Sequence, residues 1–243
     1  GDGDSLAIGG NHFIHSIRRN IDINIVLLNN RIYGLTKGQY SPTSPRGFVS
    51  KSSPFGTVED PFRPAELAFG ARGHFFARTV DVDSEVSVEV LTAAARHKGA
   101  SVVEVLQNCV IFNDGTHSAV ATKENRTENA ILLEQGKPMI FGKNKEKGLV
   151  AEGFNLKVVT IGENGITEKD LLVHDATTED NTLHQKLANM SYPEFPIALG
   201  VIRDVKAPTY DEAVAKQIAE VQAKNPTRKL KDFLMKGDIW EIK

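Results

Sequence analysis

GDGD at residues 1–4 and LLNNRIYGLTKGQ at residues 27–39 decide how this chain is expected to fold. The first stretch reads as a turn that opens a helix over residues 4–19, where apolar residues recur on one face and Asp4 is the expected N-cap. The second begins in an apolar run, residues 23–28, which predicts a short strand buried on both faces. A glycine-rich turn, a helix and a buried strand together indicate an α/β unit.

The rest of the first half continues this alternation. Residues 64–70 and 85–98 have helical patterns, whereas residues 75–82 and 101–106 are apolar runs of strand length. Helices that alternate with apolar strands favour a doubly wound, mostly parallel sheet. The stretch between residues 30 and 64 is rich in Gly, Pro, Ser and Thr, and a loop of that length is usually functional or disordered.

The second half is less regular. Residues 113–126 read as a polar loop. Strand-like runs follow at 131–133, 138–141, 156–160 and 197–201, and a helix is expected at 211–224. We expect one domain, with its core in residues 1–125. Residues 126–243 would complete it and add a C-terminal extension that packs on the core or on a partner subunit.

The composition is that of an ordinary globular protein, with 243 residues, 40% of them hydrophobic and 25% charged. A net charge of -2 gives no electrostatic reason to expect binding to nucleic acid or to a membrane. The single cysteine, Cys109, excludes an internal disulfide and fits a reducing cytoplasm. Because the chain starts inside a motif without a Met, we expect it to be the C-terminal part of a longer polypeptide that also supplies a preceding strand.

The residues around the two opening stretches suit a metal–phosphate site. A turn entering a helix offers free N–H groups to a phosphate. Mg²⁺ prefers oxygen ligands, and the Asp2 carboxylate, the Asn30 side chain and the Ile32 carbonyl would supply three of them. Each element also has an ordinary explanation, since GDG is a common turn and NN a common strand exit.

Three stretches together resemble one family: GDGDSLAIGGNHFIHSIRRN (1–20), LLNNRIYGLTKGQYSPTS (27–44) and VVEVLQNCVIFNDG (102–115). GDG followed by NN resembles the thiamine diphosphate motif. The longer stretches resemble the beta subunit of 2-oxoacid:ferredoxin oxidoreductases, closest to the 2-oxoglutarate type, and YPEFPIALGVIRDV (192–205) is similar to the same family.

The resemblance implies a thiamine diphosphate-binding α/β fold and oxidative decarboxylation of a 2-oxoacid with coenzyme A, which reduces ferredoxin through a [4Fe–4S] cluster. An alpha subunit would provide the activating carboxylate. The carried-over cofactor residues are Gly1, Asp2, Gly3, Asp4, Asn30, Ile32 and Thr36, with Asp2, Asn30 and Ile32 on Mg²⁺. Leu35 and Lys37 would contact the substrate.

Cys109 has two interpretations. A lone cysteine after a strand is usually a small buried apolar residue. The resemblance instead makes it one ligand of the iron–sulfur cluster, whose other three cysteines would lie in a segment outside this chain.

Two further classes stay open at this stage: a non-redox thiamine enzyme such as a decarboxylase or synthase, and a non-catalytic structural subunit of the same fold. His12 and His15 lie three residues apart on one helix face, but rather than a metal site we expect one of them to line the cofactor cleft and the other to be packed or solvated.

Overall fold

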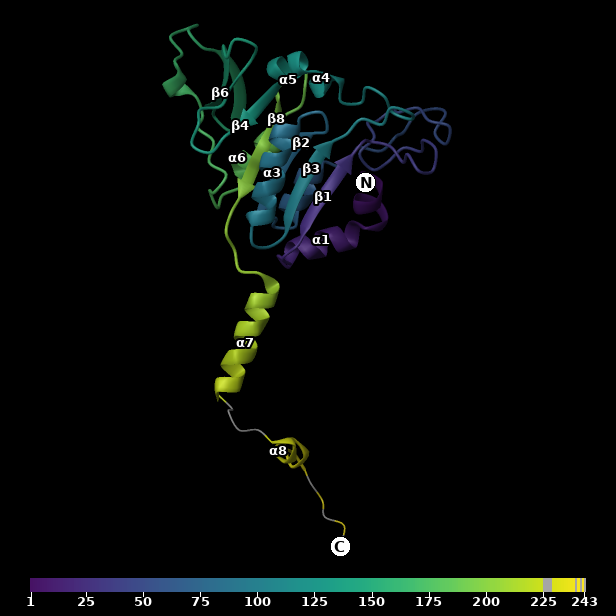
Figure 1. Ribbon diagram of the computed structural model, residues 1–243, viewed down its shortest axis with the longest axis vertical. Coiled ribbons are helices and arrows are strands. Elements are labelled where there is room, and N and C mark those ends of the chain that lie inside the picture. Colours follow the sequence, from purple (N-terminus) through teal and green to yellow (C-terminus); the bar gives the residue numbers. More distant parts are fainter. Residues whose placement is uncertain (225–228, 239, 241, 243) are drawn as a thin grey trace.

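The computed structural model describes residues 1–224, 229–238, 240 and 242. Its centre is a five-stranded sheet in the order β1-β3-β2-β8-β4 (Figure 1). Strands β1 (Asn24–Asn29), β3 (Ser101–Leu106) and β2 (Phe75–Val80) are parallel neighbours, as the alternating pattern predicts. Strand β8 (Ile197–Asp204) pairs antiparallel with β2, and β4 (Ala130–Leu133) pairs parallel with β8.

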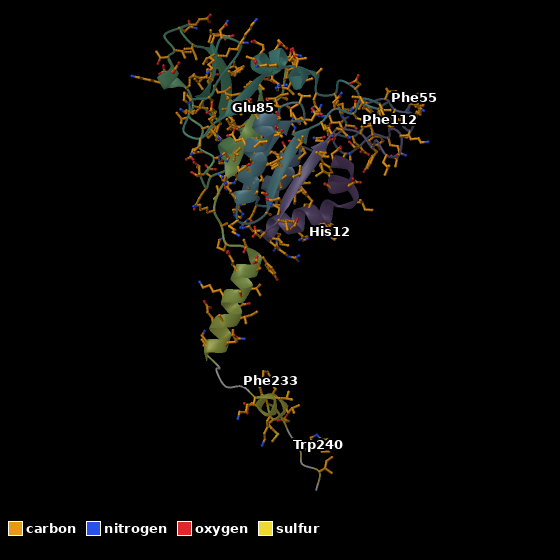
Figure 2. The ribbon with its side chains drawn as sticks, in the orientation of Figure 1. His12, Phe55, Glu85, Phe112, Phe233 and Trp240 are labelled. Atoms are coloured by element: carbon orange, nitrogen blue, oxygen red, sulfur yellow. The ribbon has the colours of Figure 1, made fainter. Side chains whose placement is uncertain are left out.

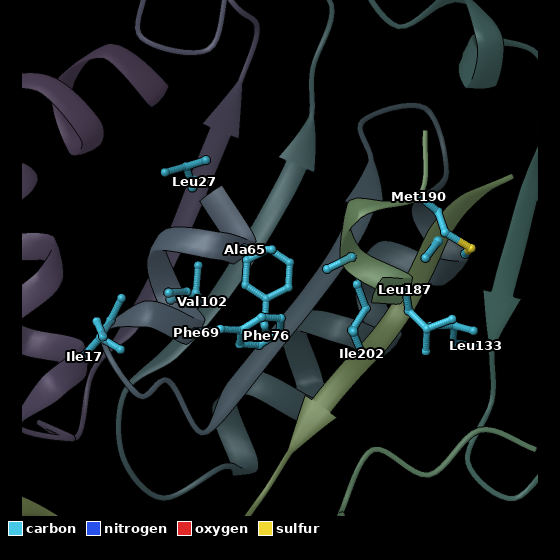
Figure 3. Close-up of a cluster of buried hydrophobic side chains, with 14 of the residues drawn as sticks. Ile17, Leu27, Ala65, Phe69, Phe76, Val102, Leu133, Leu187, Met190 and Ile202 are labelled. Atoms are coloured by element: carbon cyan, nitrogen blue, oxygen red, sulfur yellow. The ribbon is translucent and has the colours of Figure 1, made fainter. Parts of the chain in front are cut away.

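The two faces of the sheet are covered by different helices. Helices α1 (Gly10–Arg18), α2 (Pro64–Gly70) and α6 (Thr182–Asn189) contribute to one apolar cluster, which includes Phe76 and Leu27 (Figure 3). Helix α3 (Ser84–Arg96) covers the opposite face. Phe75 and Phe76 are both fully buried, one in each cluster, because successive strand residues point to opposite faces.

The burial of strand β1 differs from the sequence prediction. The apolar run predicts a strand buried on both faces, but only Leu27 and Asn29 of β1 are buried, while Val26 and Leu28 are 47% and 39% exposed. Strand β1 lies at the edge of the described sheet, and the cluster under α3 contains residues of β2 and β3 but none of β1. A continuous apolar run therefore marks one buried face here.

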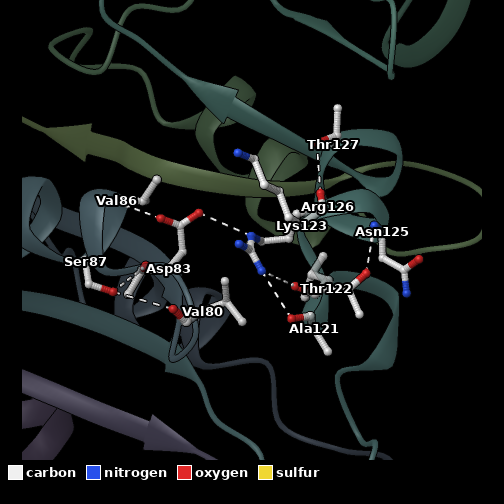
Figure 4. Close-up of polar contacts among 12 residues, drawn as sticks. Val80, Asp83, Val86, Ser87, Ala121, Thr122, Lys123, Asn125, Arg126 and Thr127 are labelled. Carbon is white, nitrogen blue, oxygen red and sulfur yellow. Dashed lines mark hydrogen bonds and ion pairs between the residues drawn. The ribbon is translucent and has the colours of Figure 1, made fainter.

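The stretch expected to be a polar loop at 113–126 contains two short helices, α4 (Ser118–Ala121) and α5 (Lys123–Asn129). Thr122 caps α5 by accepting a hydrogen bond from the Asn125 amide. Arg126 pairs with Asp83 at 3.2 Å and donates to the carbonyls of Val120 and Ala121, as Figure 4 shows. The polar residues that suggest a loop thus cap a short helix and form an ion pair with Asp83, which precedes the helix Ser84–Arg96.

The second half also contains a three-stranded antiparallel sheet of β5 (Ile140–Phe141), β6 (Lys147–Glu152) and β7 (Asn155–Thr160). Strand β6 is not predicted from the sequence. Helix α7 (Tyr210–Lys224) extends away from the body of the molecule (Figure 1), and α8 (Leu230–Leu234) follows it in the chain. In the described part of the chain, no helix has the length and apolarity needed to cross a bilayer.

Candidate functional site

The carboxyl end of β1 and the start of the chain meet at Asp2. Its side chain is 1% exposed, and Oδ2 accepts hydrogen bonds from Ser41 Oγ at 2.5 Å and Thr43 Oγ1 at 2.6 Å. The other oxygen, Oδ1, is buried and has no hydrogen-bond partner among the described residues. A buried carboxylate oxygen without a donor is costly, and a cation is one group that would satisfy it. The orphaned oxygen fits the metal role expected for Asp2.

A buried polar chain leads from Asp2 across the sheet. Thr43 Oγ1 lies 2.9 Å from Asn29 Oδ1, and Asn29 Nδ2 donates to Glu104 Oε1 at 2.7 Å. Glu104 Oε2 then accepts from Arg78 Nε at 2.8 Å. The strand register explains the contact, because Arg78 of β2 lies directly opposite Glu104 of β3. The chain ties the three parallel strands together at their carboxyl ends.

The ion pair within this chain is buried, with side-chain exposures of 9% for Arg78 and 3% for Glu104. Burial of Glu104 works to raise its pKa, but the Arg78 charge and the Asn29 hydrogen bond outweigh burial and hold the pKa below its usual value. Glu104 is therefore ionised at neutral pH.

Asn30 and Ile32 lie on the loop that leaves β1. Asn30 Oδ1 accepts a hydrogen bond from the Ile32 amide at 3.2 Å, and the Asn30 carbonyl accepts from Asn113 Nδ2 at 3.0 Å. Between them, Arg31 adopts a left-handed backbone with φ of 56°, and its carbonyl accepts from Ser44 Oγ. The loop is held in place from several directions. Whether Asn30 and Ile32 share an ion with Asp2 stays a prediction.

The GDGD stretch differs from expectation. Asp4 is not the N-cap, because the backbone is already helical at Asp2 and Gly3, and Asp4–Ile8 forms a π-helical turn before α1. Tyr33 accounts for the glycine at position 3: a methyl group added there would lie 2.1 Å from Tyr33 Cε1, and Tyr33 Oη donates to the Gly3 carbonyl. The first N–H groups of a helix have no intrahelical partner. The diphosphate role of Gly3 and Asp4 is consistent with that general property and stays a prediction.

The residues expected to contact substrate lie on an exposed loop. Leu35 is 98% exposed, Thr36 and Lys37 are also exposed, and none of them lines a described cavity. Lys37 has a left-handed backbone with φ of 70°. Their substrate and cofactor roles stay predictions.

Cys109 lies beside this loop. It is partly buried, and a methyl group added at Gly34 would lie 3.8 Å from its Sγ. Phe112 packs similarly against Gly38. Figure 2 shows Phe112 and Phe55 on the side of the body that these loops form. The structure therefore brings the expected cluster ligand next to the expected substrate loop.

A cavity of about 420 Å³ opens beside the polar chain and is lined by Asn29 and Thr43 but not by Asp2. Its charged and titratable lining consists of Arg31, Arg63, Arg78, Glu104, His117 and Tyr192. None of these is anticipated from the sequence. The available signal was a charge inside an apolar strand, Arg in FFARTV and Glu in SVVEVL.

His12 and His15 line a second cavity of about 460 Å³ between α1 and β1. Both side chains are exposed. The part of the chain that the structure describes holds no group of three or more His, Cys, Asp or Glu residues arranged for a metal. The expectation that one of them lines the cofactor cleft stays a prediction.

The comparisons with known proteins bear on the whole chain. Residues 1–105 match the family model of the thiamine pyrophosphate enzyme C-terminal TPP-binding domain. The 2-oxoglutarate oxidoreductase subunit KorB of Mycobacterium tuberculosis is 45% identical over 100% of this chain and 65% of its own length. The 2-oxoglutarate synthase subunit KorB of Archaeoglobus fulgidus is 40% identical over 65% of this chain and 60% of its own length. The chain thus spans somewhat less than two thirds of these relatives.

A solved structure supports the fold. The 2-oxoglutarate:ferredoxin oxidoreductase from Magnetococcus marinus, with 2-oxoglutarate, coenzyme A and succinyl-CoA bound, aligns with a TM-score of 0.66. The alignment covers 96% of this chain and 64% of that one, at 23% identity. With the full-length sequence match, it confirms the fold expected from the opening motifs. Together with the thiamine pyrophosphate family model, the similarity to two curated KorB subunits supports a beta subunit of the KorB type.

Proposed function

We propose that this chain is the cofactor-binding part of the beta subunit of a 2-oxoglutarate:ferredoxin oxidoreductase. With an alpha subunit in the cytoplasm, it would oxidatively decarboxylate 2-oxoglutarate or a related 2-oxoacid with coenzyme A. The products would be succinyl-CoA and CO₂, and ferredoxin would be reduced. The similarity to curated subunits of that name over the entire chain supports this proposal.

The observation that carries the proposal is the buried Asp2 carboxylate, whose Oδ1 has no partner among the described residues. When bound, thiamine diphosphate supplies the electron sink for decarboxylation. Asp2, with Asn30 and the Ile32 carbonyl, would hold its Mg²⁺, while Gly1, Gly3, Asp4 and Thr36 would contact the cofactor. Ser41 and Thr43 donate to Oδ2 and orient the carboxylate, so that Oδ1 is left for the ion.

The other residues of this chain have supporting roles in the proposal. Leu35 and Lys37 would contact the 2-oxoacid from the loop after the metal ligands. Large apolar side chains on the loops around them are strongly exposed, including Leu35, Phe55 and Ile111. Exposed apolar loops beside a site support a covering partner chain, which fits the alpha subunit.

Cys109 would be one ligand of a [4Fe–4S] cluster. It is the only cysteine of the 243 residues, so the chain by itself does not hold such a cluster, which requires four ligands. The other three thiolates would come from outside this sequence. The position of Cys109 beside Gly34 favours the redox enzyme over a non-redox thiamine enzyme, because it puts a thiol next to the substrate loop.

Asp2→Asn tests the proposal, since it keeps the shape of the side chain and removes its charge. We expect calorimetry on the alpha–beta complex with Mg²⁺ to show thiamine diphosphate binding at least tenfold weaker. Asp60→Asn is the matched control, because Asp60 is exposed and pairs only with Arg46 in the described structure. Equal cofactor affinity in Asp2→Asn and the control would defeat the assignment.

A further inference from the structure

The cavity of about 420 Å³ beside the polar chain carries more positive charge than its own carboxylate neutralises. Three arginines line it, Arg31, Arg63 and Arg78, against the single carboxylate of Glu104. Both oxygens of Glu104 are already engaged, one by Asn29 and one by Arg78. Arg78 is therefore compensated, whereas Arg31 and Arg63 have no ion-pair partner in the described residues.

Arg31 is the clearest case. It is half-buried, it lines the cavity, and its guanidinium has no ion-pair partner within 4 Å among the described residues. Its left-handed backbone, with φ of 56°, is uncommon for a residue other than glycine, asparagine or aspartate. Hydrogen bonds from Ser44 and Asn113 to its carbonyl hold that conformation. The fold thus maintains a strained backbone that places a cation without a direct ion pair in the cavity wall, with the carboxylates of Glu104 and Asp2 only in its wider surroundings.

The rest of the lining suits the other end of a small organic molecule. His117 is buried, and its Nε2 is bonded to the Asn29 carbonyl. Burial, with the nearby Arg31 charge, lowers the pKa of His117 to about 4, so it adds no positive charge at neutral pH. Asn189 Oδ1 is buried without a partner, and Pro45, Leu106 and Met190 add apolar surface. The volume lies in the range of cavities that bind small molecules.

We propose that this cavity binds a small organic anion whose carboxylate or phosphate is held by Arg31 and Arg63. Arg31 would contact the anion from the wall and Arg63 from the exposed rim, with the apolar part of the molecule against the prolines and Met190. The buried amide oxygen of Asn189 has no partner among the described residues and would accept a hydrogen bond only from a ligand that also carries a donor group. Asp2 does not line this cavity, whereas Thr43, which bonds to Asp2, does, so the two sites are neighbours. The inference does not depend on the proposed reaction.

The test is calorimetric titration of the complete protein with succinate and, separately, with inorganic phosphate, in a buffer of low ionic strength without anionic components. We expect at least one probe to saturate the protein, and the tighter one identifies the carboxylate or the phosphate class. Arg31→Asn, which suits the left-handed backbone, should weaken binding at least tenfold, and Arg63→Gln at least threefold. Arg46→Gln, an exposed arginine outside the cavity, should leave binding unchanged.

Three outcomes would overturn the inference: no saturable binding of either probe, wild-type affinity in both Arg31→Asn and Arg63→Gln, or displacement of the probe by thiamine diphosphate with Mg²⁺. Displacement would place the anion in the cofactor site. Arg63→Gln guards against misfolding of Arg31→Asn, because Arg63 is exposed and makes one long hydrogen bond to the Asn189 carbonyl. Failure of the cofactor-binding test with Asp2→Asn leaves this prediction standing, so the two are distinguishable.

Discussion

Replacing Arg78 with methionine tests how strongly the buried polar chain holds the sheet edge together. Methionine keeps most of the apolar stem but leaves the Glu104 carboxylate, 3% exposed, without its cation. Breaking a buried ion pair from one side costs about 3–5 kcal/mol. For a chain of this length, the melting temperature should fall by roughly 2–4 °C per kcal/mol. We therefore expect a loss of roughly 6–20 °C.

The pH dependence identifies the cause. In the wild type, the lowered pKa of Glu104 contributes stability that is present above the unfolded pKa and lost as the pH falls through the folded pKa. In Arg78→Met, burial is no longer offset and Glu104 takes up a proton more readily. The deficit measured by urea denaturation should therefore shrink between pH 7 and pH 4.5.

Two further variants make the result interpretable. Arg78→Met with Glu104→Gln removes both charges and keeps an acceptor for Asn29, so it should recover most of the loss. Arg46→Met breaks an exposed pair, with side chains 60% and 81% exposed, and should cost no more than about 1 kcal/mol. If Arg78→Met costs no more than Arg46→Met and shows no pH dependence, the reasoning fails.

Three other perturbations test separate parts of the site. His117, with its pKa lowered to about 4, binds a proton later than in the unfolded chain, so stability should fall from pH 6.5 to pH 4 by about 3 kcal/mol; urea denaturation of His117→Asn should lose that component. Gly3→Ala puts a methyl group 2.1 Å from the Tyr33 ring and should destabilise by about 1–3 kcal/mol, with recovery in Gly3→Ala/Tyr33→Ala. Cys109→Ser in the complete complex should lower the iron content while leaving the circular dichroism spectrum unchanged; full iron content would return Cys109 to the role of a buried thiol.

Local patterns predict the elements of the first half well. Helix α2 and strand β3 have the predicted bounds, because both combine clear periodicity with Gly, Pro or polar residues at their ends. The direction of a strand and its pairing partner are not predicted by such local patterns. The run that becomes β8 is recognised as a strand, but its antiparallel pairing with β2 depends on a partner more than a hundred residues away. No local pattern encodes such pairing.

The residues of the candidate site likewise fall into those that a local motif identifies and those that depend on strand pairing. The metal-binding role expected for Asp2 agrees with its burial and orphaned oxygen, because the motif containing it is local. Arg78 and Glu104 are missed because each looks like an isolated charge in an apolar strand. Only the pairing of β2 with β3 puts them opposite each other and turns two apparent defects into one ion pair. A charge in a buried strand therefore predicts an opposite charge on a neighbouring strand.

Thr43 links the two parts of the site and limits what each can do. Its hydroxyl carries one hydrogen but lies 2.6 Å from Asp2 Oδ2 and 2.9 Å from Asn29 Oδ1. It can donate to only one of these acceptors at a time. The Asn29 amide is oriented by its donation to Glu104, so its oxygen stays directed at Thr43 whichever way the hydroxyl turns. A change in the hydrogen bonding of Asp2 therefore changes which acceptor the Thr43 proton serves. It thereby alters the hydrogen bonding of Asn29, which lines the arginine-lined cavity.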